Sequence, residues 1–271
     1  ERVAGLRYTD PDGVERAVRA RFVVDASGNK SRLYSSVGGT RNHPGPAGGP
    51  ALSGYFGLCR QPAPYAGDTL TVAFDSGWFW YTPLTGGLSS VGVVVRPELA
   101  ERIQGDREKA LQALIAECPL ISDLLSAAAR VIAGPKYGRL RVWDTSSYHQ
   151  TAFWRPGMIL VGDAACFVDP VFSSGVHLAT YSALLAARSI NSVLADELDE
   201  KTALTGFEAR YRREYEIFHE FSGSFHDPDA DQESYLRQAR KITNSEYTER
   251  AAFADLAGGF SSGEWQLDRP L

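Results

Sequence analysis

The feature that most constrains the fold is a strand-to-helix junction in the second half of the chain. A short apolar run, Met158 to Val161, lies between two glycines and has the pattern of a strand buried on both faces. The run breaks at Gly162-Asp163, passes through a turn that contains Pro170, and reaches Ser173-Ser174-Gly175. Residues 176–194 contain neither Gly nor Pro and are predicted to form a helix.

Such a junction is suited to hold a polar, partly anionic ligand. Unpaired backbone N–H groups at the start of a helix attract negative charge, and Asp163 can accept hydrogen bonds from ligand hydroxyls. Ser173 and Ser174 lie in no Gly-x-Ser-x-Gly elbow, so we expect them to cap the helix rather than to act as nucleophiles. Many junctions of this kind serve packing alone, and the residues leave both roles open.

A second strand end lies near the start of the chain. Residues 3–9 and 14–24 are strand-like, and the turn Asp10-Pro11-Asp12-Gly13 between them predicts a hairpin. The second run closes on Asp25-Ala26-Ser27-Gly28, where backbone can approach a ligand. Gly38 to Gly54 is rich in Gly and Pro, and we expect a long irregular loop there.

The middle of the chain predicts an antiparallel sheet. Its strand candidates are Tyr55–Cys59, Leu70–Phe74, Trp78–Pro83 and Ser89–Val95. Alternation places Trp78 and Trp80 on one face and Phe79 and Tyr81 on the other. These aromatic residues either fill the sheet or form a wall of a pocket for a planar ligand.

The segments that flank the sheet suggest that it is inserted into an α/β domain. Residues 97–133 have helical spacing with an interruption at Pro119, so we expect a second short helix that ends near Ile132. Residues 138–154 are predicted to be extended and to lead back to the strand-to-helix junction.

The last part of the chain is predicted to be helical. Residues 201–221 form an amphipathic helix whose aromatic stripe is expected to lie in the core; the stripe is Phe207, Tyr211, Tyr215 and Phe218. A calcium loop that begins at Asp227 would need Gly where Gln232 stands and Glu where Gln238 stands. We interpret residues 227–232 as an acidic helix start before Tyr235–Ile242. Residues 258–271 are expected to fray.

Composition excludes several classes of protein. A net charge of -5 argues against a nucleic-acid-binding surface, and no apolar run is long enough to span a membrane. Three widely spaced cysteines form neither a disulfide framework nor a zinc site, which favours a reducing cytoplasm. The five histidines show no metal-ligand spacing, and His177 is expected either to pack or to face a ligand. Neither a Walker loop nor a Gly-x-Gly-x-x-Gly motif is present.

The combination of these motifs resembles flavin-dependent halogenases, a family within the FAD-dependent aromatic monooxygenases. The resemblance rests on residues 23–28, on the segment from Gly77 to Leu84, and on residues 162–175. Gly77 to Leu84 is similar to the Trp-x-Trp-x-Ile-Pro signature of the family, with Thr82 in place of its Ile. The implied fold is mixed α/β. It consists of a Rossmann-like FAD-binding domain (1–50 and 134–200), an antiparallel-sheet substrate domain (51–133) and a C-terminal helical region (201–271).

The resemblance also implies a chemistry. Reduced FAD reacts with O2 to give a flavin hydroperoxide, chloride attacks it, and the resulting hypochlorous acid halogenates the substrate. The implied partners are a flavin reductase and an electron-rich aromatic molecule, either free or held on a carrier protein, in natural-product or antibiotic biosynthesis. Ser174 and Gly175 would receive the halide, Phe172 and Trp80 would line the substrate pocket, and Trp78 and Trp80 would suppress direct hydroxylation. The residues implied to bind FAD are Asp25, Gly28, Gly162, Asp163, Ala164, Pro170, Ser173, Gly175 and Val176.

Two departures from the family pattern qualify these expectations. Phe172 stands where tryptophan halogenases have a catalytic Glu, which favours a phenol or a pyrrole over free tryptophan. The Gly-x-Gly-x-x-Gly unit and the catalytic lysine that follows it have no counterpart here. We therefore expect a chain that represents the later two-thirds of a halogenase and is inactive alone. A monooxygenase or reductase of the same fold and a non-catalytic remnant are the alternatives.

Overall fold

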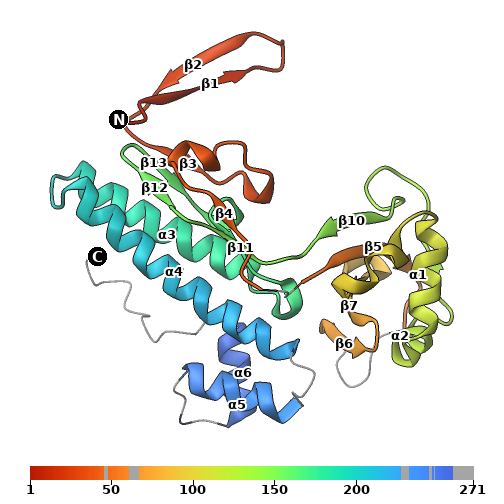
Figure 1. Ribbon diagram of the computed structural model, residues 1–271. Coiled ribbons are helices and arrows are strands. Elements are labelled where there is room, and N and C mark those ends of the chain that lie inside the picture. The colour runs from red at the N-terminus through yellow and green to blue at the C-terminus, as the bar shows by residue number, and fades with distance from the viewer. Residues whose placement is uncertain (46–47, 61–66, 227–231, 244–245, 247, 259–271) are drawn as a thin grey trace. The chain divides into compact units, whose positions relative to one another are not determined.

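A computed structural model describes residues 1–45, 48–60, 67–226, 232–243, 246 and 248–258. The chain divides into two compact units (Figure 1). Unit 1 consists of residues 1–45 and 147–271, and unit 2 of residues 46–146. Unit 2 is therefore inserted into unit 1 in sequence. These boundaries differ from the predicted 50/51 and 133/134, and the domain assignment itself stays a prediction.

The strands of unit 1 form three small sheets. The hairpin pairs β1 (Gly5–Thr9) with β2 (Glu15–Arg19) through the predicted turn, in which the Gly13 N–H donates to the Asp10 carbonyl oxygen. A second sheet has the order β12 (Trp154–Arg155), β13 (Met158–Leu160), β3 (Val23–Asp25), and only the β13–β3 pair is parallel. The third joins β14 (Cys166–Phe167), β11 (Tyr148–Gln150) and β4 (Arg41–Asn42).

The helices of unit 1 cover the buried strand β13. The helix α3 (Gly175–Leu194) lies beside α4 (Glu200–Phe225), and α5 (Gln232–Thr243) packs on α6 (Glu249–Ala257) (Figure 1). The predicted aromatic stripe of α4 lies in the core with β13, which confirms its structural role. No helix in the described ranges is long and apolar enough to cross a membrane.

Unit 2 is an antiparallel sheet packed against short helices. The order is β10 (Arg141–Asp144), β5 (Pro50–Gly57), β8 (Leu88–Val95), β7 (Gly77–Pro83), β6 (Leu70–Phe74), and β9 (Ala129–Arg130) also pairs with β5. One face packs on a 3₁₀ segment (Pro97–Ile103), on α1 (Arg107–Ala116) and on α2 (Pro119–Leu124). This core includes Phe79 and Tyr81, and the indoles of Trp78 and Trp80 contact each other, as alternation predicted.

Hydrogen bonds between Gly49 and Thr145 join the two ends of unit 2. The Thr145 N–H donates to the Gly49 carbonyl oxygen at 2.9 Å, and the Gly49 N–H donates to Thr145 Oγ1 at 3.1 Å. A Cβ atom on Gly49 would lie 2.1 Å from the Val95 carbonyl oxygen, and one on Gly48 would lie 2.6 Å from Ser146 Cα. Glycine at position 48 thus allows the close approach to Ser146, and glycine at position 49 allows the close approach to β8.

Three predicted boundaries were wrong. The loop expected from Gly38 to Gly54 contains β4, and β5 already begins at Pro50 because it pairs with both β8 and β10. The second helix ends at Leu124, and residues 129–130 form a strand on β5 instead. The run 14–24 is divided between β2 and β3, which belong to different sheets. The acidic start at Asp227 and nearly all of the end at 258–271 lie outside the described residues.

Candidate functional site

The structure brings the two predicted strand ends together in unit 1. Strands β3 and β13 are parallel neighbours with Asp25 paired opposite Leu160, so both chains leave the sheet at the same edge. The Val161 N–H donates to the Asp25 carbonyl oxygen at 3.0 Å. The 3₁₀ turns Gly28–Lys30 and Gly162–Ala164 follow these strands and contact each other. Ligands of α/β sheets bind at such carboxyl ends of parallel strands.

The Asp25 carboxylate orders the first turn. It is 3% exposed and accepts hydrogen bonds from the Ser27 N–H at 2.9 Å and from the Ser27 and Ser31 hydroxyls. Gly28 adopts a left-handed φ of +80°, and a Cβ there would meet nothing within 4 Å. The geometry gives Asp25 a positioning role, whereas Gly28 borders open space.

Gly162 is fixed from both sides. Its N–H donates to the Ser182 hydroxyl of α3 at 2.9 Å, and its carbonyl oxygen accepts from the Tyr211 hydroxyl of α4 at 3.2 Å. Its φ of +56° lies in the left-handed region, and a Cβ would lie 3.3 Å from that of Ala179. Glycine thus lets α3 approach the turn that carries Asp163.

Asp163 is a half-buried carboxylate to which no described residue offers a hydrogen bond or a cation. Burial raises its pKa, because the charged form loses hydration without a compensating partner. Its backbone carbonyl oxygen accepts from the Tyr148 hydroxyl at 2.6 Å, which holds the turn in place. A ligand with hydroxyl groups would supply the donors that this carboxylate lacks. The site therefore fits the polyhydroxylated chain of a flavin.

The loop between Asp163 and α3 is tied to the end of α4. Asp169 is fully buried, and its carboxylate accepts from the Val171 N–H at 2.9 Å and lies 3.1 Å from His226 Nε2. Pro170 begins a 3₁₀ turn that ends at Ser173, whose φ of +58° is left-handed. A carboxylate and an imidazole 57 residues apart thus fix the approach to the helix.

The start of α3 differs in one respect from the prediction. Ser174 occupies the N-cap position, as predicted, but its side chain makes no capping hydrogen bond. Space beside Gly175 is open, and the Val176 side chain is 76% exposed. The first N–H groups of this helix consequently need an acceptor other than a serine side chain, which an anion could supply.

Phe172, predicted to line a substrate pocket, lies in an aromatic cluster. Its ring stacks on Phe221 with centroids 4.2 Å apart and meets Phe225, Tyr235 and Phe253 at larger angles. The cluster joins the loop before α3 to α4, α5 and α6. Any lining role for Phe172 would be confined to the part of the ring that these neighbours leave uncovered.

His177 packs, which was one of its two predicted roles. Its Nε2 lies 2.6 Å from the Oε1 atom of buried Glu214 on α4, and its ring contacts Tyr181 and Phe218. The histidine therefore fastens the first turn of α3 to α4.

In unit 2, Trp78 and Trp80 lie on the sheet face opposite α1 and α2. Trp80 Nε1 donates to the Ser90 hydroxyl at 3.2 Å, and its ring contacts those of Trp78 and Trp143. A Cβ on Gly92 would lie 2.2 Å from the Trp80 ring, so only glycine leaves room for this indole.

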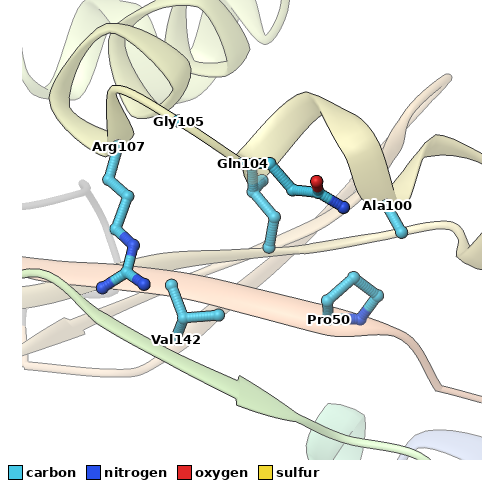
Figure 2. Close-up of a pocket in the computed structure, with 7 residues that line it drawn as sticks. Pro50, Ala100, Gln104, Gly105, Arg107 and Val142 are labelled. Carbon is cyan, nitrogen blue, oxygen red and sulfur yellow. The ribbon is translucent and has the colours of Figure 1, made fainter.

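The helix-covered face of unit 2 carries a separate cavity of about 350 Å³ (Figure 2). Pro50, Val142, Ala100 and Ile103 give it apolar walls, and Gln104 and Arg107 lie at its rim. Figure 2 shows the Arg107 side chain extending toward Val142. The cavity is on the opposite sheet face from the tryptophans and does not include any of the predicted site residues.

Comparison with known proteins decides the family. The family model described as tryptophan halogenase matches residues 1–267. The chain belongs to the tryptophan halogenase family. It is 29% identical over 237 residues to a tryptophan 2-halogenase of Chondromyces crocatus, covering 86% of this chain and 44% of that protein. It is 32% identical over 231 residues to the flavin-dependent halogenase gsfI of Penicillium aethiopicum, covering 80% and 42%.

A solved halogenase structure agrees with the fold. The myxobacterial chondrochloren halogenase CndH, described as a new variant of FAD-dependent halogenases, is 50% identical with a TM-score of 0.81. The match covers 99% of this chain and 60% of that one. This confirms the expected mixed α/β fold of FAD-dependent halogenases. The chain spans less than half the length of the two curated relatives.

In this member of the halogenase family, the predicted site residues of unit 1 form two groups. Gly28, Gly162, Asp163 and Ala164 meet at the strand ends. Ser173 ends the preceding 3₁₀ turn, and Ser174, Gly175 and Val176 form the start of α3. Sequence reasoning missed Ser182, Tyr148 and Arg41, which support the strand-end turns. Of these, only Ser182 had a usable signal, because a serine on the buried face of an apolar helix needs a polar partner. Among the described residues, no group of three potential ligands is placed to hold a metal.

Proposed function

We propose that this chain is part of an FADH2-dependent halogenase that chlorinates an electron-rich aromatic molecule, using O2 and chloride. The proposed substrate is a phenol or a pyrrole, either free or bound to a carrier protein, and a separate flavin reductase supplies the reduced cofactor. Membership of the tryptophan halogenase family supports the reaction class. The presence of Phe172 where that family's tryptophan-specific enzymes have Glu supports the substrate class.

The observation that carries the proposal is the Asp163 carboxylate. It is half-buried, lacks a donor among the described residues, and stands at the shared edge of two parallel strands. Retaining a carboxylate in this state costs stability unless a ligand compensates it. Hydroxyl groups of a ribityl chain are suitable donors.

When bound, reduced FAD would supply the electrons that activate O2. The residues of this chain would bind and orient. Gly162 and Ala164 would bring backbone close to the cofactor, and Asp163 would accept hydrogen bonds from it. The N–H groups of Ser174 and Gly175 would hold chloride at the start of α3, with Pro170, Ser173 and Val176 beside them. Trp78 and Trp80 would suppress direct hydroxylation of the substrate.

The test is a halide-dependent change in product mass. The protein is produced from its complete open reading frame and supplied with FADH2 by a reductase, a panel of phenols and pyrroles, and either chloride or bromide. Products that gain chlorine in one case and bromine in the other support the proposal. Hydroxylation that ignores the halide would overturn it in favour of a monooxygenase.

A matched pair of variants tests the site. Asp163→Asn removes a charged acceptor, and a charged hydrogen bond contributes about 1.5–3 kcal/mol, so FAD affinity should fall about 10- to 100-fold. Asp196→Asn is the control, because Asp196 is an exposed carboxylate beyond the end of α3. Equal FAD affinities of the two variants would remove Asp163 from the site.

A further inference from the structure

Arg41 is a partly buried cation near the strand-end turns, and the described residues provide it with no carboxylate. Its guanidinium lies 3.9 Å from the ring centroid of Tyr148 and 4.9 Å from that of Tyr34. Its Nε is buried and has no hydrogen-bond partner among the described residues. One hydrogen bond, from Nη2 to the Asn29 carbonyl oxygen, is long at 3.4 Å. Most of the five N–H donors of this side chain thus lack an acceptor within the described part of the chain.

The position of Arg41 connects it to both strand ends. Asn29 belongs to the 3₁₀ turn that follows β3. Tyr148, on which the guanidinium stacks, donates its hydroxyl to the carbonyl oxygen of Asp163 in the turn that follows β13. Arg41 itself is held in register by β4, where it pairs opposite Gln150 of β11. The Arg41 side chain is therefore held by its neighbours and is not a freely exposed surface side chain.

Contact with the tyrosine rings stabilises the positive charge of Arg41. It does not satisfy the N–H donors, which lie in the plane of the guanidinium group. Aromatic faces attract a cation above them, while the in-plane edge of the guanidinium still requires oxygen acceptors. A half-buried guanidinium with an unused planar edge is the arrangement that binds phosphate or carboxylate oxygens in pairs.

We infer that Arg41 binds a phosphate group of the flavin nucleotide; this inference rests on the proposed function. In a flavin nucleotide the ribityl hydroxyls are followed directly by a phosphate. The Tyr148 hydroxyl holds the backbone of Asp163, and the Arg41 guanidinium lies over the Tyr148 ring, so one tyrosine contacts both residues. The Asp163 carboxylate would bind hydroxyls and the Arg41 guanidinium an oxyanion, which are neighbouring groups of one ligand.

The experiment compares three flavins that differ in phosphate content. Binding of FAD, FMN and riboflavin is measured by quenching of flavin fluorescence, using protein from the complete open reading frame. Arg41→Gln is compared with Arg139→Gln, an exposed arginine in unit 2. We expect Arg41→Gln to weaken FAD and FMN about tenfold or more and to leave riboflavin unchanged. Arg139→Gln should leave all three affinities unchanged.

The outcomes separate this inference from the proposed function. Unchanged FAD binding by Arg41→Gln would overturn the role of Arg41 while leaving the flavin site intact. Equal weakening of all three flavins would also overturn it, because Arg41 would then only support the turns. If the native protein bound no flavin, both proposals would fail. Should Arg41→Gln not fold, Arg41→Lys keeps the charge but loses the planar fork, and the same selective loss of FAD and FMN over riboflavin is required.

Discussion

The hydroxyl of Ser182 provides a quantitative test of how the Gly162-Asp163 turn is held. Ser182 on α3 is fully buried, and its Oγ accepts the Gly162 N–H at 2.9 Å while donating to the Ala179 carbonyl oxygen. Ser182→Ala would leave a buried N–H without an acceptor. An unsatisfied buried donor costs about 1–3 kcal/mol. In a domain of this size we expect the melting temperature to fall by about 4–8 °C for a loss near 2 kcal/mol.

The same helix offers a matched control. Ser189 is equally buried on α3, but its hydroxyl has no hydrogen-bond partner among the described residues. Ser189→Ala removes the same atom without orphaning a partner, and should be neutral or stabilising by up to about 1 kcal/mol. Both variants are followed by far-UV circular dichroism during thermal and urea unfolding. Equal losses of stability in the two variants would refute the reasoning, because burial alone would then explain the effect.

Three further predictions concern the loop, the tryptophan face and Asp163. Phe172→Ala should lower the free energy of unfolding by about 2–4 kcal/mol, since it removes contacts with four aromatic rings. Phe172→Leu should lower it by less. A urea titration that shows no loss of stability for Phe172→Ala would contradict this. Gly92→Ala should displace the Trp80 indole and alter the near-UV circular dichroism, so an unchanged spectrum would show that the ring has room. Because burial raises the pKa of Asp163, its protonated form is favoured on folding, and stability should decline as the pH rises from 3.8 through the raised pKa. In the absence of flavin, Asp163→Asn should abolish this decline and melt at a higher temperature than the native protein at neutral pH; a lower melting temperature would reveal an unrecognised protein partner of the carboxylate.

Local sequence patterns predicted the helices, strands and turns whose conformation depends on residues nearby in the sequence. The glycine-bounded run at 158–161 and the uninterrupted helical stretch after it correspond to β13 and α3 within one residue at each boundary. The turn at residues 10–13 and the alternation of Trp78 to Tyr81 were equally readable, because turn residues and side-chain periodicity act over a few positions.

Elements that depend on distant partners could not be predicted in this way. Pro50 to Gly54 has the composition of a loop, yet pairing with β8 and β10 makes it strand. The tie between Asp169 and His226 joins positions that have no shared local pattern. Ser174 has the residue type of a helix cap but not the geometry, since its backbone is helical (φ −74°, ψ −6°) rather than extended. The supporting roles of Tyr148 and Arg41 likewise arise only when β4 and β11 are paired.

The junction of Gly48 and Gly49 with Thr145 makes unit 2 a natural cassette for protein engineering. At the two ends of the inserted segment, the Thr145 N–H donates to the Gly49 carbonyl oxygen and the Gly49 N–H donates to the Thr145 hydroxyl. A foreign segment therefore has to preserve only this pair of contacts. A chimera that retains both glycines and the threonine, and exchanges the sequence between them with that of a relative, should preserve the connection geometry. Such exchanges would test the prediction that the inserted sheet is the substrate domain.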